Sequence, residues 1–168
     1  EGRTTTRHTF CRKNRSQKYQ LSIKDIKSIT SKDKFVSKSA LCSSDLKFKK
    51  NGSKFDDLIA GWVAYWNDVF HPDDLLDPNL VKALIASESG LDPRCLADKK
   101  NPKSARGLMQ VLDSTRLILK NPKGELKDYL VGTTSREEMN DPSTNICAGI
   151  RWLFYKRERA SAKLEKAA

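Results

Sequence analysis

Two Asp-Pro pairs, Asp77-Pro78 and Asp141-Pro142, are the feature that most restricts how this 168-residue chain can fold. An aspartate at the N-cap followed by a proline at the first helical position is typical of a helix start. The first pair predicts a helix that ends at Gly90, and the second predicts a helix that runs from Pro142 to about Lys163. Because six residues from Leu80 to Ala86 are apolar and cover nearly every face, we expect the first helix to be central and buried.

Further helices are expected around these two. With Ser53 as the N-cap, the segment 55–70 carries apolar residues at helical spacing, and shorter helices are expected at 114–119, near 126–130 and at 136–139. The last helix should bury Ile146, Ile150, Leu153 and Phe154, and Gly149 inside it should mark the close approach of another backbone. The segment 91–106 is a long loop, and loops of that length within a compact domain tend to be functional. The chain is therefore expected to be mostly α.

The excess of positive charge lies in one part of the chain. The net charge is +11, and residues 1–54 contain 15 Lys or Arg against 4 Asp or Glu, whereas residues 55–168 contain 17 of each. Leu21, Ile26 and Ile29 could share one side of a short helix, and Asn51-Gly52 is a turn signal. We therefore expect a basic, partly irregular N-terminal extension or subdomain at 1–54, and a separate helical domain at 55–168.

The basic extension is either a solvated segment or an arm that attracts anionic wall polymers or nucleic acid. Its aromatic residues are widely spaced, which argues against a stacking platform for nucleic acid. No apolar run approaches the roughly 20 residues that span a bilayer, so membrane insertion is not expected. The first twenty residues lack the apolar stretch of a secretory signal peptide, and the chain begins with Glu1, so we interpret it as a fragment or a processed form.

The cysteines and histidines do not suggest a metal centre. Cys11, Cys42, Cys95 and Cys147 show no CxxC spacing, and the chain has only two histidines. In an oxidising compartment the four cysteines could form up to two disulfides, and otherwise they would be reduced core residues.

Glu88 is the most informative polar residue. It shares one helix face with Leu80 and Leu84, and it falls in the last turn, where the helix dipole disfavours a carboxylate. An apolar setting and the dipole would both raise the pKa of Glu88, which suits a general acid at neutral pH. The alternative is a frayed helix end with the carboxylate in water.

An ordered set of motifs follows Glu88. Glu88-Ser89-Gly90 precedes Gly107-Leu108-Met109-Gln110, with Gln110 22 residues after Glu88, and the segment 141–153 then contains Asn145-Ile146 and Gly149. This set, over about residues 75–155, resembles the soluble lytic transglycosylase and goose-type lysozyme superfamily. The resemblance implies a lysozyme-like α-helical catalytic domain that cleaves the β-1,4 bond between N-acetylmuramic acid and N-acetylglucosamine in peptidoglycan glycan strands, with no cofactor and no metal.

The resemblance also implies roles for individual residues. Glu88 matches the family's single catalytic glutamate, which protonates the leaving glycosidic oxygen and then acts as a base. The base step draws a proton either from the muramic acid 6-hydroxyl, giving a 1,6-anhydro product, or from water. Asn145 and Gly149 match the helix behind the site. The residues expected to contact substrate are Leu108, Met109, Gln110, Ser104 and Tyr155.

Two features depart from the family pattern. The family usually has an Ala-Tyr-Asn motif some thirty or more residues after the Asn-Ile helix, and this sequence does not contain it. Either the sequence stops short of the motif, or another residue replaces its tyrosine, for which Tyr155 and Tyr129 are candidates. Goose-type enzymes also carry aspartates near the cleft, for which Asp113 and Asp98 are candidates. A hydrolase would hold such a carboxylate roughly 6.5 to 9.5 Å from Glu88. Asp113 could instead cap the helix that begins at Ser114.

The sequence therefore favours a monomeric, bacteriolytic or wall-remodelling glycosidase, either a muramidase or a lytic transglycosylase. It would act in the periplasm or at the cell wall, within a longer protein such as an antibacterial type VI secretion effector. The alternative is a peptidoglycan-binding module with weak turnover, suggested by the missing Ala-Tyr-Asn motif. A nucleic-acid-binding domain rests on the net charge alone and is the least favoured of the three.

Overall fold

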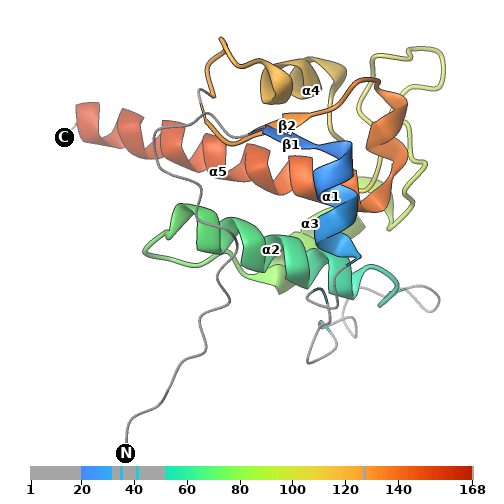
Figure 1. The fold of residues 1–168 in the computed structure, drawn as a ribbon, viewed down its shortest axis with the longest axis horizontal. Helices are drawn as coiled ribbons and strands as arrows, with labels where there is room; N and C mark the ends of the chain where they lie inside the picture. Colours follow the sequence, from blue (N-terminus) through green and yellow to red (C-terminus); the bar gives the residue numbers. More distant parts are fainter. Residues whose placement is uncertain (1–19, 32–34, 36–40, 42–51, 127, 168) are drawn as a thin grey trace, which may run out of the picture.

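The computed structural model describes residues 20–31, 35, 41, 52–126 and 128–167. Helices account for most of this part of the chain, which confirms the expected mostly α, lysozyme-like class. Figure 1 shows the arrangement of the elements. In chain order they are β1 (Gln20–Ser22), α1 (Ile23–Thr30), α2 (Asp56–Phe70), α3 (Pro78–Ser89), α4 (Asp113–Lys120), β2 (Leu130–Gly132), the 3-10 helix η2 (Glu137–Asn140) and α5 (Pro142–Ala167).

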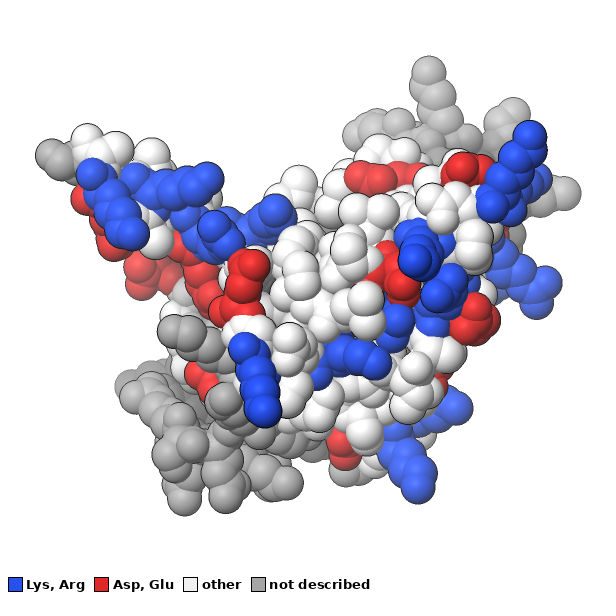
Figure 2. Space-filling view, turned by 90° about the horizontal axis from the view of Figure 1, so that it is seen from above, with Lys and Arg blue, Asp and Glu red and all other residues white. Residues whose placement is uncertain are grey.

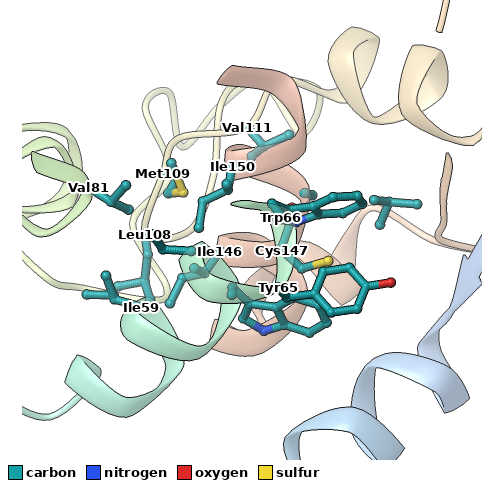
Figure 3. Close-up of a cluster of buried hydrophobic side chains, with 14 of the residues drawn as sticks. Ile59, Tyr65, Trp66, Val81, Leu108, Met109, Val111, Ile146, Cys147 and Ile150 are labelled. Carbon is teal, nitrogen blue, oxygen red and sulfur yellow. Dashed lines mark hydrogen bonds between the residues drawn. The ribbon is translucent and has the colours of Figure 1, made fainter. Parts of the chain in front are cut away.

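The centre of the fold is the parallel packing of α2 against α5. Trp62 Nε1 donates to Ser143 Oγ at 2.9 Å, and one turn further along both helices Trp66 Nε1 donates to the Cys147 carbonyl at 3.0 Å. After another turn the guanidinium of Arg151 lies 4.7 Å from the centre of the Phe70 ring. Both indoles are fully buried, and both of their N–H groups are hydrogen-bonded. The contact therefore buries a large apolar area and also fixes which residues of α2 and α5 lie opposite each other. Figure 3 shows side chains of α2, α3 and α5 meeting in this core.

The described part of the N-terminal segment belongs to the same core. Strand β1 pairs in parallel with β2, with Leu21 opposite Val131, and helix α1 lies across α5 (Figure 1). Leu21 and Ile26 are fully buried, and Phe35 packs edge-on against Trp62 with ring centres 5.1 Å apart. One hydrophobic core therefore contains side chains from both sides of the expected boundary at residue 54.

A buried ion pair fastens this segment to two helices. Lys82 Nζ of α3 lies 2.9 Å from Asp56 Oδ1 of α2, and neither side chain is more than 7% exposed. The same two side chains bind the backbone of Leu41, whose N–H donates to Asp56 Oδ2 at 3.1 Å and whose carbonyl accepts from Lys82 Nζ at 3.2 Å. These two hydrogen bonds fix the position of the Leu41 backbone against α2 and α3. Removing either charged partner would leave the other charge buried and uncompensated.

The expected helix near 126–130 is wrong. Tyr129 has a left-handed backbone, with φ of +53°, and the chain then enters β2 at Leu130. The carbonyls of Asp128 and Tyr129 accept hydrogen bonds from the buried guanidinium of Arg151, at 3.1 and 2.9 Å, so they are paired with α5 rather than within a helix.

The expectation that α3 is a central, buried helix is also wrong. In α3 only Val81, Lys82 and Ile85 are buried, and Leu80 is 62% exposed. Only one side of this helix packs against the core, so some of its apolar residues lie on the solvent side. At the start of α2 the predicted cap is likewise wrong, because Phe55 rather than Ser53 occupies the N-cap position.

Helix α5 continues beyond the core. All residues from 156 to 167 are exposed, and Figure 2 shows this end of the helix projecting from the body with both acidic and basic side chains. Within the described ranges, no helix combines the length and apolar composition that crossing a bilayer requires.

We predict that Lys82→Met lowers the free energy of unfolding by about 3–5 kcal/mol, because it leaves Asp56 buried without its cation and the Leu41 carbonyl without its donor. Urea denaturation of the full chain measures this difference. The matched control is Lys166→Met on the exposed end of α5, which should change stability by less than about 0.5 kcal/mol. Equal effects of the two substitutions would contradict this role of the pair.

Candidate active site

The end of α3 is sharply defined by its caps. Asp77 Oδ1 accepts from the Asn79 N–H at 2.8 Å, and Gly90 adopts a left-handed conformation with φ of +60°, as the sequence predicted. Leu91 follows with φ of +63° and is buried. The helix therefore stops directly after Ser89 without fraying, and Glu88 lies in its last turn.

Glu88 is exposed, so the expectation of an apolar setting is wrong. The residues that share its face contribute little cover, because Leu80 is exposed and Leu84 is only partly buried. Within the described part of the chain, the Glu88 carboxylate makes no hydrogen bond and no ion pair. It is thus an exposed carboxyl group that is free to contact a ligand.

Ser89 links the end of α3 to the segment 107–111. Its hydroxyl lies 2.9 Å from the Leu108 carbonyl and 3.1 Å from the Ile85 carbonyl of its own helix, and it donates to these oxygens. Leu108 of the second motif is therefore hydrogen-bonded to Ser89, the residue that follows Glu88. Ser89 lies inside the first motif, but its place in the sequence gives no sign of this contact with a residue 19 positions away.

The segment 107–111 forms a tight turn. Arg106 and Val111 exchange both backbone hydrogen bonds, at 3.2 and 3.0 Å, and the Gly107 N–H donates to the Cys95 carbonyl at 2.9 Å. Gln110 has a positive φ of +46°, and its side-chain amide donates to the carbonyls of Gly107 and Cys95. The amide of Gln110 therefore holds the turn together, while its residue stays partly exposed.

The apolar residues of this turn face the core. Leu108 is fully buried and Met109 is 9% exposed (Figure 3). Three of the residues expected to contact substrate lie in this turn, and of these Gln110 alone is more than marginally exposed. Leu108 and Met109 thus position the turn, and the structure does not place Leu108 on a surface.

Asn145, near the start of α5, holds the 107–111 segment in place through its side-chain amide. Its Oδ1 accepts from the Met109 N–H at 2.7 Å, and its Nδ2 donates to the carbonyls of Arg106 and Met139 at 3.0 and 2.9 Å. The side chain is fully buried, and three of its four hydrogen-bonding positions are filled. This single amide therefore joins the second motif to the third.

Glycine is required at two positions around this amide. At Gly107, where φ is +76°, a Cβ atom would lie 2.2 Å from Asn145 Nδ2. At Gly149 it would lie 2.4 Å from Met109 Sδ. A close approach at Gly149 is present, but the prediction that another backbone makes it is wrong, because the approaching atoms belong to the Met109 side chain.

Asp113 is held by arginines rather than left free for catalysis. Its Oδ1 accepts from Arg116 Nε at 2.7 Å, and Arg136 lies 3.8 Å from its Oδ2. The hydrogen bond from Arg116 and the charges of Arg116, Arg136 and Arg106 lower the pKa of Asp113 despite its burial. Its expected role as a cap is wrong, since Leu112 is the N-cap of α4 and Asp113 is the first helical residue.

The remaining candidates are engaged in local contacts. Asp98 is exposed and its Oδ1 accepts from the Lys100 N–H, while buried Ser104 bonds the Asp98 backbone.

The two candidate tyrosines also make contacts of their own. Tyr155 donates to Glu125 and accepts from Arg159, and Tyr129 packs edge-on against Phe70. Tyr155 also lies ten residues beyond Asn145 on α5, a rise of about 15 Å. The structure therefore does not gather these tyrosines with Glu88 and the second motif.

Cys95 and Cys147 are both free thiols. Burial raises the pKa of Cys147 well above its ordinary value. Cys11 and Cys42 lie outside the described residues. In the described ranges no three His, Cys, Asp or Glu side chains come together as metal ligands would.

The family model for the transglycosylase SLT domain matches residues 73–168, and the chain belongs to this family. The match begins just before α3 and includes Glu88, the 107–111 turn and all of α5 up to the chain end. No curated protein and no solved structure matches the chain. Membership of this family supports an action on peptidoglycan of the lytic transglycosylase or lysozyme kind in general.

We predict that Asn145→Asp lowers the free energy of unfolding by about 3 kcal/mol or more, because it replaces a donor to two carbonyls with a buried carboxylate oxygen. Thermal and urea unfolding both measure the loss. Asn140→Asp, the same chemical change at a neighbouring exposed position, is the control and should have little effect. A stable Asn145→Asp protein would show that this amide does not fix the turn.

Asp113→Asn should lower the free energy of unfolding by about 1–3 kcal/mol at pH 7, since it removes a charged hydrogen-bond acceptor from Arg116. The pKa of Asp113 is lower in the folded chain than its ordinary value of 3.8. Its stabilisation is therefore complete above that value and is lost as the pH falls through the lower, folded-state pKa.

Urea unfolding of the Asp113→Asn protein at pH 7 and in steps to about pH 2 measures this dependence. The difference from the unaltered chain should shrink at the acid end. Asp73→Asn, at an exposed position, is the control. A difference that stayed constant down to pH 2 would contradict the assigned pKa shift of Asp113.

Proposed function

We propose that this chain cleaves the β-1,4 bond between N-acetylmuramic acid and N-acetylglucosamine in peptidoglycan, with Glu88 as the general acid and base. One observation carries the proposal. Glu88 is an exposed carboxylate without a partner in the described residues, at the capped end of α3, and its neighbour Ser89 binds the turn that contains the family's second motif. The site thus combines a free acid with a rigid support.

Glu88 would protonate the glycosidic oxygen as the bond to the leaving sugar breaks. A glycan strand lying over Glu88 would bring a glycosidic oxygen within hydrogen-bond reach of the carboxyl group, which is the geometry that proton transfer needs. The resulting carboxylate would then accept a proton from the group that attacks the muramic acid carbon. Both steps use one residue, so they require no second carboxylate.

The attacking group would be the muramic acid 6-hydroxyl, and the product would be a 1,6-anhydro sugar. The environment of Asp113 supports this choice over hydrolysis. A water-holding carboxylate needs free oxygen atoms, and Oδ1 of Asp113 is occupied by Arg116, with Arg136 beside Oδ2. Asp98 lies on an exposed loop and accepts from the backbone. We therefore favour the lytic transglycosylase reaction over the muramidase reaction.

Peptidoglycan lies outside the cytoplasmic membrane, so we place the activity in the periplasm or at the cell wall. We further propose that the chain acts as a monomer within a longer protein, for which a type VI secretion effector is one setting. The sequence of the complete gene tests that setting directly.

A peptidoglycan-binding module with weak turnover is the alternative. It is supported by the contacts of Tyr129 with Phe70 and of Tyr155 with Glu125, since within the described residues neither tyrosine is hydrogen-bonded to Glu88. Binding of sacculi without release of soluble fragments would distinguish this module from an enzyme.

We predict that Glu88→Gln abolishes release of muropeptides from purified sacculi, with a loss of at least about 100-fold, because the near-isosteric amide cannot donate the proton. Mass spectrometry of the released fragments measures both the rate and the product. The control is Glu165→Gln on the exposed end of α5, which should retain full activity.

Fragments lighter by one water than the hydrolysis product would identify the lytic transglycosylase reaction, and reducing ends would identify a muramidase. Full activity of the Glu88→Gln protein would overturn the assignment of Glu88. Absence of fragments from the unaltered chain, together with binding to sacculi, would favour the module.

A further inference from the structure

The loop between α3 and α4 carries a group of lysines beside the candidate site. Residues 95–107 form a hairpin in which Leu96 bridges Arg106 and the Ala97 N–H donates to the Ala105 carbonyl at 2.9 Å. The base of the hairpin is bonded to the site turn, because the Cys95 carbonyl accepts from the Gly107 N–H and from the Gln110 amide. We call residues 98–103 the hairpin tip.

The hairpin tip is held rigidly by its own hydrogen bonds. Buried Ser104 bonds both the N–H and the carbonyl of Asp98, at 3.1 and 3.0 Å. Asp98 Oδ1 and Asn101 Oδ1 each accept the backbone N–H two residues ahead, and Arg106 donates to the Pro102 carbonyl at 2.6 Å. The polar side chains of the tip other than its lysines are thus used to fix its backbone.

The lysines of the tip are left exposed and unpaired. Lys99, Lys100 and Lys103 are all exposed, and within the described ranges none of them forms an ion pair. The tip contains one acidic residue, Asp98, against these three cations. By contrast, Lys82, Arg106, Arg116 and Arg136 all have acidic partners. Figure 2 shows basic side chains projecting from the end of the molecule opposite the free end of α5.

We propose that the hairpin tip binds the peptide stem of peptidoglycan through the carboxylates of that stem. This inference rests on the proposed function for the identity of the polymer. In intact peptidoglycan the lactyl carboxyl groups of the glycan are bound to the peptide stems as amides, whereas the stems carry free carboxylates, so a cluster of ammonium groups selects the stem. Ammonium and carboxylate groups attract over a Debye length of about 10 Å at 0.1 M salt.

The reach of the tip fits a stem attached near the site. The tip begins three residues after Cys95 at the hairpin base and so lies within roughly 10 Å of it, because the chain spans at most about 3.3–3.6 Å per residue. An extended peptide gains a similar length per residue, so a stem of a few residues spans the same distance from a sugar bound at Glu88. A rigid tip also loses little conformational freedom on binding.

The test compares two forms of one polymer. Uncrosslinked glycan strands that bear peptide stems, and the same strands with their stem carboxylates converted to neutral amides, are titrated into the Glu88→Gln chain, which holds the strands without cutting them. The test variant adds Lys99→Gln, Lys100→Gln and Lys103→Gln to this chain. The control adds Lys123→Gln, Lys163→Gln and Lys166→Gln, which remove the same charge elsewhere on exposed surface.

We expect the test variant to bind stem-bearing strands about fivefold more weakly at low salt, as a few exposed ion pairs would give. Binding of the amidated strands should not change, and the control should match the parent. The difference should vanish near 1 M salt, where the Debye length is about 3 Å. Equal losses for both kinds of strand, no loss for either, or no binding of stem-bearing strands by the parent would overturn the proposal.

Two further measurements distinguish stem binding from nucleic-acid binding and from the proposed enzymatic function. Lysine-dependent binding of a DNA duplex that is tighter than binding of stem-bearing strands would overturn the assignment in favour of nucleic acid. Cleavage of sacculi by the unaltered chain tests the proposed function independently. Lysine-dependent binding without cleavage would leave the stem site standing and reject the enzyme, and cleavage without lysine dependence would do the reverse.

Discussion

The buried amide of Asn145 is the interaction on which the geometry of the candidate site depends. It bonds the Met109 N–H and the carbonyls of Arg106 and Met139, so one side chain of α5 sets the path of the segment that carries the second motif. Gly107 and Gly149 leave the space that this arrangement needs. Because α5 is itself fixed against α2 by the indoles of Trp62 and Trp66, the rigidity of the core extends to the site turn.

The site built on this support has an unusual division of roles. Glu88 is exposed and has no hydrogen-bond partner within the described residues. The polar side chains of Ser89 and Gln110 instead donate hydrogen bonds to backbone carbonyls, Ser89 to Leu108, and Gln110 to Gly107 and Cys95. Asp113 is likewise committed to Arg116. A single free carboxylate on a preorganised support suits a reaction in which one group donates and then accepts a proton, and in which the substrate provides the rest of the environment.

Charge in this chain serves different purposes in different places. The Lys82–Asp56 pair is buried and binds the backbone of Leu41, so it joins the N-terminal segment to α2 and α3. At the hairpin tip the lysines are exposed, and the rigid backbone beneath them is held by Asp98, Asn101 and Ser104. The net charge of +11 alone indicates a generic polyanion as partner, whereas the location of individual cations distinguishes structural pairs from a surface that can bind a ligand.

The sequence by itself determined the elements whose signals are local. The Asp77-Pro78 start and the Gly90 stop of α3, the Pro142 start of α5 and the mostly α class all follow from caps and periodicity, and the spacing of the motifs identified the family. Only the tertiary structure decided the exposure of Glu88, the approach of Arg136 to Asp113, the left-handed Tyr129 in place of a helix, and the burial of Leu21 and Leu41 in the main core. Each of these depends on a partner distant in the chain, and a cap or a helical period contains no information about which distant group will supply the hydrogen bond or cover the face.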